Sequence, residues 1–301
     1  MNKTIGLAGA LLLSTVLAAH SETVLLSMKG PGSGNPFWAA VQAGAEEKAK
    51  ELGVDLVVLA PPEESDVQSQ INQVEDQLAK KIDALAIAPT DPNALAPVVD
   101  SAIKQGVGVV FVDTKGINDG VTFIGTNNEV GAALAAEFIC KSIPAGSDVA
   151  ILQGIITQST GQARADGAHK GLSDCGMKIV AEQPADWDTA KAQAAMENII
   201  TGNPNLKAVF ASNDNMALGA VQALKSANML DNVMVVGFDA NPNAAESILK
   251  GEMTASVAQN PKNMGRFGVE NALKVKKGEK IDAVIDTGTV LVTKDNAADY
   301  K

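Results

Sequence analysis

The sequence predicts an α/β protein of two lobes, each built around its own parallel sheet. Short β-rich runs alternate with helical stretches along the chain. The runs are almost continuously apolar, which is typical of parallel strands covered on both faces. Helices between strands supply the crossovers that parallel pairing requires. Once a predicted leader is set aside, about 280 residues remain, enough for two domains of ordinary size.

The predicted strands are spaced regularly along the chain. They are 24–28, 54–60, 84–89, 107–113, 149–154, 177–183, 206–212, 233–239 and 253–259. Helical stretches between them include 37–52, 94–105 and 216–227. This alternation is typical of a doubly wound sheet.

The alternation is interrupted near residues 113–130, where KGINDGVTFIGTNNEVG adds turn residues and one short strand. Beyond this segment the strand–helix rhythm restarts. We therefore expect one lobe to end here and a second lobe, with its own sheet, to begin. The pattern becomes irregular again in GEKIDAVIDTGTVLVT, near the C-terminus.

The N-terminus, residues 1–21, has the pattern of a secretory signal peptide. A lysine at the third position precedes an apolar run, and Ala18, Ala19 and Ser21 are candidate cleavage positions. The run is shorter than the roughly 20 residues that a membrane-spanning helix needs. No cysteine follows it, which disfavours a lipid anchor. We predict an exported, soluble mature protein.

Charge and cysteine content narrow the classes of partner. A formal net charge of −11 disfavours nucleic acid and anionic lipid as binding partners, because both bind surfaces rich in Lys and Arg. Cys140 and Cys175 lie in an exported chain where a disulfide can persist, but their spacing alone leaves open whether they are bonded. There is no CxxC motif, and His20 and His169 fit no ligand pattern, so we expect no metal and no cofactor.

Polar and aromatic residues gather where the predicted strands end. In doubly wound sheets, ligands bind in the crevice outside the carboxyl ends of the strands. The residues at these ends are Asn35, Phe37, Trp38, Asp113, Arg164, Trp187, Asn213, Phe238, Asp239 and Gln259. Taken alone, Asn213 favours a helix cap and Phe238 a place in the core. Together, the set predicts a cleft lined by rings, amides, carboxylates and one arginine.

This combination suits an uncharged polyol. Sugar hydroxyls both donate and accept, so planar carboxylate, amide and guanidinium groups can bind neighbouring hydroxyls with matched geometry. The C–H faces of a pyranose are apolar and can lie flat against indole and phenyl rings. Large aromatic rings on loops would be exposed to water, and a sugar that covers them explains their position. The sequence therefore predicts a sugar-binding protein.

The motifs NPFW, QSQINQVEDQLAKKIDALAIAPTD, TGQARADG, QPADWD, NDNMALGA, VVGFD and VAQNP resemble those of the periplasmic ribose- and allose-binding proteins of ABC importers. The likeness spans essentially the whole mature chain, with the motifs in the family's order. It implies a type I periplasmic binding protein of two Rossmann-like lobes, with three hinge crossings near residues 126, 259 and 287. The implied lobes are 22–126 with 259–287, and 127–258 with 288–301.

The resemblance also implies how such a protein works. A monosaccharide of the ribose or allose type would be held between the lobes by the strand-end residues and delivered to an ABC permease from the periplasm, without catalysis. A sugar alcohol (a pentitol or tetritol) is an alternative ligand. A chemoreceptor is a further partner that the sequence leaves open, and we expect a monomer.

Two departures from the family's pattern bear on the ligand. The loop KGPGSG before NPFW is longer than expected, and Asp113 is followed by Thr114, where ribose binders carry Arg and allose binders an acidic residue. Both changes fall beside the expected ligand. Lys29 and Thr114 are therefore additional candidate residues, and the identity of the sugar stays open.

Two other classes of protein fit less well. GPGSG after a strand superficially resembles a dinucleotide loop, but Asn35 stands where the last glycine should be, and the next strand ends without the acidic residue that would bind a ribose hydroxyl. A nucleotide-dependent enzyme is therefore the remote alternative. A sugar-sensing transcription regulator would need a helix-turn-helix where the predicted leader lies.

Overall fold

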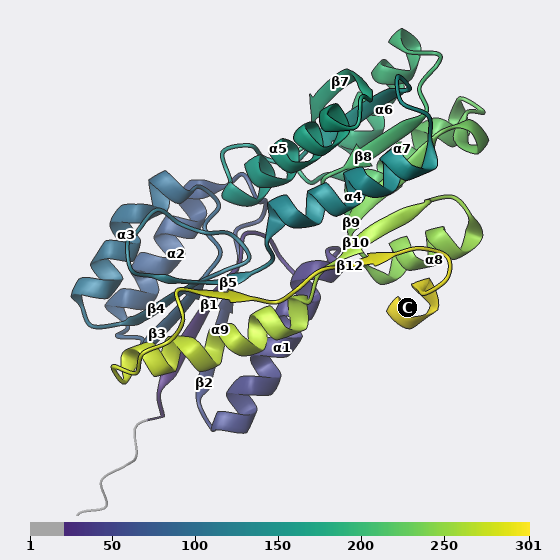
Figure 1. The fold of residues 1–301 in the computed structure, drawn as a ribbon. Helices are drawn as coiled ribbons and strands as arrows, with labels where there is room; N and C mark the ends of the chain where they lie inside the picture. The colour runs from purple at the N-terminus through teal and green to yellow at the C-terminus, as the bar shows by residue number, and fades with distance from the viewer. Residues whose placement is uncertain (1–20) are drawn as a thin grey trace, which may run out of the picture.

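The computed structural model describes residues 21–301 and contains two α/β lobes joined into an elongated molecule (Figure 1). This confirms the predicted fold class. The predicted leader and His20 fall outside the described residues, apart from the last leader position, Ser21.

The first lobe is built on a six-stranded sheet in the order β11-β5-β4-β3-β1-β2, with every pair parallel. Its strands are β1 (Thr23–Ser27), β2 (Asp55–Leu59), β3 (Ala84–Ile87), β4 (Gly108–Val112), β5 (Thr122–Gly125) and β11 (Val284–Asp286). Its helices are α1 (Pro36–Leu52), α2 (Val67–Ala79), α3 (Pro92–Lys104) and α9 (Pro261–Lys276). Successive residues of β1 point to opposite faces: Val24 packs in the core with α1 and α9, and Leu25 in the core with α2 and α3.

The second lobe repeats the plan with a sheet in the order β12-β10-β9-β8-β6-β7. Its strands are β6 (Asp148–Gln153), β7 (Lys178–Pro184), β8 (Ala208–Ala211), β9 (Met234–Asp239), β10 (Ala255–Ala258) and β12 (Val290–Val292). Its helices are α4 (Asn128–Ser142), α5 (Ser159–Asp174), α6 (Thr189–Gly202), α7 (Asp214–Ser226) and α8 (Pro242–Lys250), with 3-10 turns η1 (Leu230–Asn232) and η2 (Ala297–Tyr300). One core lies under α4 and α5, and the other under α6, α7 and α8.

One strand departs from the prediction of purely parallel sheets. β12 pairs with β10 in the antiparallel direction. It arrives from β11 of the other lobe through a short turn rather than through a crossover helix. Without a helix to return the chain to the same end of the sheet, the strand can join only in the opposite direction.

The chain passes between the two sheets in three places. These are the segments between β5 and α4, between β10 and α9, and between β11 and β12. All three lie where the two lobes meet (Figure 1). The carboxyl ends of the strands of both sheets therefore face the space between the lobes.

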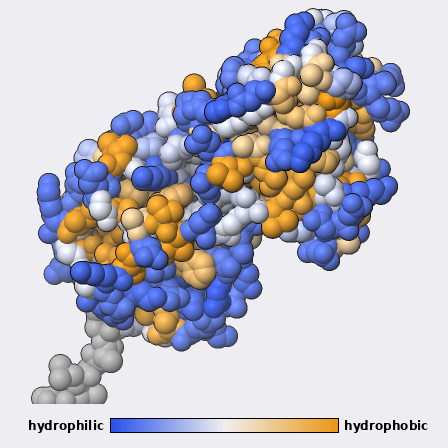
Figure 2. Space-filling model, viewed as in Figure 1, coloured by the Kyte–Doolittle hydropathy of each residue, from blue (hydrophilic) through white to orange (hydrophobic). Residues whose placement is uncertain are grey.

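The surface of the described residues is mixed. Hydrophilic residues cover much of both lobes on the face shown in Figure 2, with hydrophobic residues visible on each lobe. No helix of residues 21–301 is long and apolar enough to span a bilayer. Cys140 and Cys175 form a disulfide that ties the end of α4 to the end of α5.

Helices α1 and α9 approach so closely that glycine is required on both. A Cβ added at Gly44 would lie 1.9 Å from the carbonyl oxygen of Lys262, and one at Gly265 would lie 1.9 Å from that of Val41. Both partner atoms are backbone and cannot swing aside. This contact fixes α9, which enters the first lobe directly after one of the three crossings.

We predict that Gly265→Ala lowers the free energy of unfolding by roughly 1–3 kcal/mol, because the added methyl group overpacks a rigid backbone contact. Gly202→Ala is the matched control, since a Cβ there has no neighbour within 4 Å. Urea denaturation followed by circular dichroism measures both. Equal stability of Gly265→Ala and wild type would show that the helices are not in this contact.

Candidate functional site

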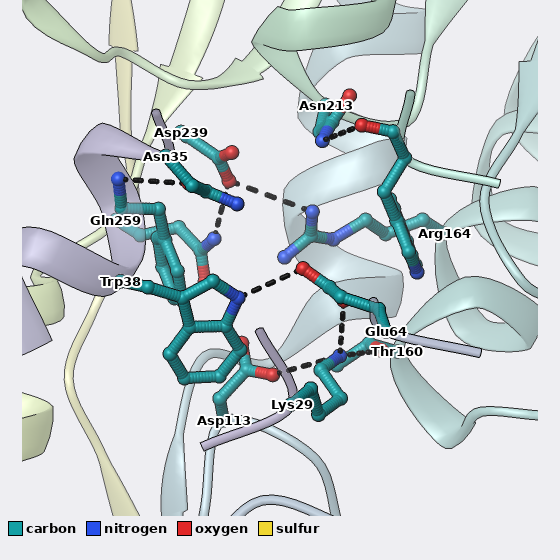
Figure 3. A pocket seen from close by; sticks show the side chains of 12 residues that line it. Lys29, Asn35, Trp38, Glu64, Asp113, Thr160, Arg164, Asn213, Asp239 and Gln259 are labelled. Atoms are coloured by element: carbon teal, nitrogen blue, oxygen red, sulfur yellow. Dashed lines mark hydrogen bonds and ion pairs between the residues drawn. The ribbon is translucent and has the colours of Figure 1, made fainter. Parts of the chain in front are cut away.

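A pocket lies between the lobes, at the carboxyl ends of both sets of strands. Its walls come from both lobes (Figure 3). The lining residues are Lys29, Asn35, Phe37, Trp38, Glu64, Asp113, Thr160, Arg164, Trp187, Asn213, Asp239 and Gln259. The cavity between these side chains has a volume of about 30 Å³. That is far below the roughly 300–1,000 Å³ range of small-molecule sites, because side chains from both lobes converge on this space.

Of the main residues that the sequence places in a ligand cleft, all but Phe238 line this pocket. Phe238 is fully buried behind it, with its ring 3.8 Å below the guanidinium carbon of Arg164. Its neighbour Asp239 faces the pocket. Side chains alternate along a strand, so the two cannot both point into the pocket from β9. Phe238 supports the arginine instead.

The two additional candidates have different places. Lys29 lines the pocket and is 3% exposed. Thr114 is fully buried just behind the wall, where its hydroxyl donates to Asp113 Oδ2 at 2.8 Å and lies 3.4 Å from Thr160 Oγ1. It orients the carboxylate and does not line the pocket.

Two asparagines of the pocket also begin helices. Asn35 accepts from the Phe37 backbone N–H at 3.1 Å and caps α1, and Asn213 accepts from the Met216 N–H at 2.9 Å and caps α7. Asn213 Nδ2 also donates to the Trp187 carbonyl at 3.3 Å. The capping interpretation and the pocket position are therefore compatible, because the cap uses the oxygen and leaves the amide N–H₂ toward the pocket side.

The aromatic walls are fixed by packing and by indole hydrogen bonds. Phe37 and Trp38, in the first turn of α1, pack edge to face with centroids 5.1 Å apart. The Trp38 Nε1–H donates to Glu64 Oε1 at 2.8 Å. The Trp187 Nε1–H donates to Gln158 Oε1 at 2.9 Å. Both indoles are thereby held with their rings toward the pocket.

Three pocket residues adopt left-handed backbone conformations although none is glycine. The φ angles are 61° at Asp113, 65° at Trp187 and 115° at Asp239. Such conformations cost energy for residues with a Cβ and cluster at ligand sites, where the surrounding fold holds them in place. Asp113 and Trp187 follow β4 and β7, Asp239 is the last residue of β9, and all three line the pocket between the lobes.

Lys29 occupies the centre of one charge cluster. Its Nζ lies 3.1 Å from Asp113 Oδ2, 2.9 Å from Gln158 Oε1 and 3.4 Å from Thr160 Oγ1. Glu64 Oε2 is 3.7 Å away. Asp113 and Glu64 belong to the first lobe, whereas Gln158 and Thr160 belong to the second. The ammonium therefore joins acceptors from both sides of the pocket.

Arg164 forms the second cluster, within the second lobe. Its Nε donates to Asn128 Oδ1 at 2.7 Å and its Nη1 to the Ser212 carbonyl at 2.8 Å. Nη1 is also 3.5 Å from Asp239 Oδ1. No described residue accepts a hydrogen bond from Nη2, which leaves this part of the fork for a bound molecule. Burial lowers the pKa of Arg164, an effect that Asp239 and Asp113 oppose.

Asp239 is a pocket carboxylate whose pKa is strongly changed by its surroundings. Burial raises its pKa from an ordinary value of 3.8 to about 7, against Arg164 and the hydrogen bond from Gln259, which lower it. Gln259 Nε2 donates to Asp239 Oδ1 at 2.6 Å. Gln259 comes from the crossing after β10, so this bond ties a crossing segment to the pocket.

Three contributors were missed from the sequence. They are Glu64, which follows β2, Thr160, which lies at the start of α5, and Gln158, which directly precedes α5. All follow strands on the carboxyl side, the position that selected the other residues. Their side chains carried no aromatic or clustered signal, so only the fold brings them to the pocket.

The geometry offers binding groups of both hydrogen-bonding types around apolar rings. Among the described residues, no group of histidine, cysteine and carboxylate side chains could hold a metal ion. His169, the one histidine in the described part of the chain, contacts Glu182 away from the pocket. The pocket therefore suits a small neutral molecule that carries several hydroxyl groups.

Known proteins with similar sequences share this architecture. A family model described as a periplasmic binding protein domain matches residues 27–280. The D-allose-binding periplasmic protein of Escherichia coli is 36% identical, over 91% of this chain and 90% of its own length. The ribose import binding protein of Salmonella typhimurium is also 36% identical, over 98% of this chain and 99% of its own length.

A solved structure gives the same result. It is an ABC transporter periplasmic solute-binding protein from Actinobacillus succinogenes with bound D-allose. It is 33% identical, covers 93% of this chain and 100% of its own, and superposes with a TM-score of 0.87.

We predict a pH signature of the raised pKa of Asp239. Between about pH 4 and 7 the folded protein binds a proton that the unfolded chain has released, so the free energy of unfolding falls as pH rises through this window. Asp239→Asn removes this contribution, and the variant should lose less stability between pH 5 and 8 than wild type. Denaturant titrations at several pH values measure the two slopes, and equal slopes would contradict the assignment.

Proposed function

This chain belongs to the periplasmic binding protein family, and we propose that it captures one monosaccharide between its lobes and delivers it to an ABC permease. The observation that carries the proposal is the meeting of two indoles from different lobes in one pocket. Trp38 and Trp187 lie 5.7 and 5.5 Å, measured to their ring centroids, from the same atom, Lys29 Nζ. A sugar ring has two faces that such walls can cover.

The polar groups of the pocket suit the hydroxyl groups around the edge of the same sugar ring. Asp113 and Asp239 offer carboxylate oxygens from opposite lobes, and the free Nη2 of Arg164 and the amide of Asn35 offer donors. A hydroxyl can donate to the first kind of group and accept from the second. Because these groups are buried, a ligand that lacked matching hydroxyls would leave them without partners, at a cost of about 1–3 kcal/mol each.

Lobe closure is part of the proposed mechanism. Hydrogen bonds cross the cleft from Ser159 Oγ to the Lys115 carbonyl at 3.1 Å and from the Lys115 N–H to Ser159 Oγ at 2.9 Å. We propose the crossings near residues 126, 259 and 287 as hinges, between lobes of residues 22–126 with 259–287 and of residues 127–258 with 288–301. A sugar that contacts both lobes favours the closed form by its differential affinity for it. The permease would recognise the closed form.

Family membership also supports a location and a partner. We place the mature protein in the periplasm, exported by the leader at residues 1–21, and acting as a monomer that carries its ligand without chemical change. A chemoreceptor could use the same closed form as a second partner. A small pocket walled by both lobes favours a single sugar unit over an oligosaccharide.

The direct test is a calorimetric titration against D-ribose, D-allose, D-arabinose, myo-inositol, ribitol and erythritol. We expect one molecule to bind per chain, with a dissociation constant of about 1 μM or lower for at least one aldose. If only a polyol binds, the ligand is a sugar alcohol rather than an aldose. Binding of no member of the panel would contradict the proposal.

We predict that Trp187→Ala weakens sugar binding roughly 30-fold, because it removes about 2 kcal/mol of ring contact. His169→Ala, an exposed change outside the pocket, is the matched control and should bind like wild type. Titration calorimetry measures both, and thermal melts verify that each variant is folded. An unchanged affinity of folded Trp187→Ala would remove this ring from the site.

A further inference from the structure

Gln158 connects the two lobes from behind the pocket wall. It is fully buried but does not line the pocket. It occupies the N-cap position of α5, yet its side chain makes no capping hydrogen bond. Glutamine is not among the residues favoured at this position, and capping therefore does not explain it.

The side chain instead bonds to three groups. Oε1 accepts from Trp187 Nε1 at 2.9 Å and from Lys29 Nζ at 2.9 Å. Nε2 donates to the Glu64 carbonyl at 3.3 Å. Trp187 is in the same lobe as Gln158, whereas Lys29 and Glu64 are in the other. One carboxamide therefore contacts an aromatic wall of the pocket and the lobe that closes over it.

These bonds differ in when they can form. The bond to Trp187 stays within the second lobe and is available whether the lobes are apart or together. The bonds to Lys29 and Glu64 require the lobes to meet. The orientation of the Trp187 indole depends on its bond to Gln158. The backbone φ of Trp187 is 65°, and its ring packs against Gly154, where a Cβ would lie 2.2 Å from the indole.

We propose that Gln158 is a positioning residue that orients the Trp187 indole in the open protein and then secures the closed form around the ligand. This inference rests on the proposed sugar-binding function. Gln158 itself does not touch the ligand. Its bonds to the first lobe exist only after closure, so their loss should speed release much more than it slows capture.

Amide chemistry is needed for this role. Oε1 must accept from an indole N–H and an ammonium, and Nε2 must donate to a carbonyl, so both ends of the amide are used. Gln158→Met keeps the length and removes every hydrogen bond. Gln158→Glu keeps the two accepted bonds, loses the donor, and adds a negative charge near Asp113 and Glu64.

The kinetic test is stopped-flow tryptophan fluorescence with D-ribose and D-allose. We expect Gln158→Met to raise the dissociation rate roughly 10-fold and to change the association rate less than about 3-fold. Gln158→Glu should lie between Gln158→Met and wild type. Gln162→Met is the control, since Gln162 lies one turn further along α5 and its side chain bonds only to Asp166 among the described residues. A dissociation rate of Gln158→Met equal to wild type would overturn the proposal.

A second measurement separates positioning from a general loss of structure. The chain has only two tryptophans, so 5-fluorotryptophan labelling gives one ¹⁹F resonance for Trp38 and one for Trp187. In ligand-free Gln158→Met, the Trp187 resonance should shift or broaden while that of Trp38 stays in place. Unchanged resonances would overturn the positioning role, even if sugar binds. If wild type binds neither sugar, the proposed function fails, and this spectrum still decides the role of Gln158.

Discussion

The site depends on one interaction: the Lys29 ammonium, buried between the two lobes, bonds to partners on both. The Lys29 ammonium is 3% exposed and reaches acceptors of the first and the second lobe, at 3.1 Å from Asp113 and 2.9 Å from Gln158. Asp113 and Glu64 of the first lobe compensate the charge, and Gln158 and Thr160 of the second lobe accept its remaining hydrogen bonds. The aromatic rings, the arginine fork and the crossings are arranged around this shared cluster.

The fold was largely predictable because its cause is local. Continuous apolar runs and intervening helices specify parallel strands, and the strand-end rule then places Asn35, Asp113 and Trp187 at the carboxyl ends of the strands of the two sheets without any knowledge of contacts. The antiparallel direction of β12 could not be predicted in this way. Its direction follows from the path of the chain between lobes, and a short apolar run is the same in either direction.

The site was predictable in its membership and less so in its connections. Phe238 carries the right chemistry but lies behind Arg164, since strand alternation gives the pocket to Asp239. Glu64 and Gln158 carry ordinary chemistry and reach the pocket region only through tertiary structure. A residue's type can thus indicate a ligand, whereas its use in orienting another side chain has no sequence pattern of its own.

The most direct measurement is a crystal structure of the protein grown with D-allose or D-ribose. The account predicts density for one sugar between the indoles of Trp38 and Trp187, with hydroxyls within hydrogen-bonding distance of Asp113 and Asp239. A sugar bound to one lobe alone, or at a site that neither indole touches, would contradict it.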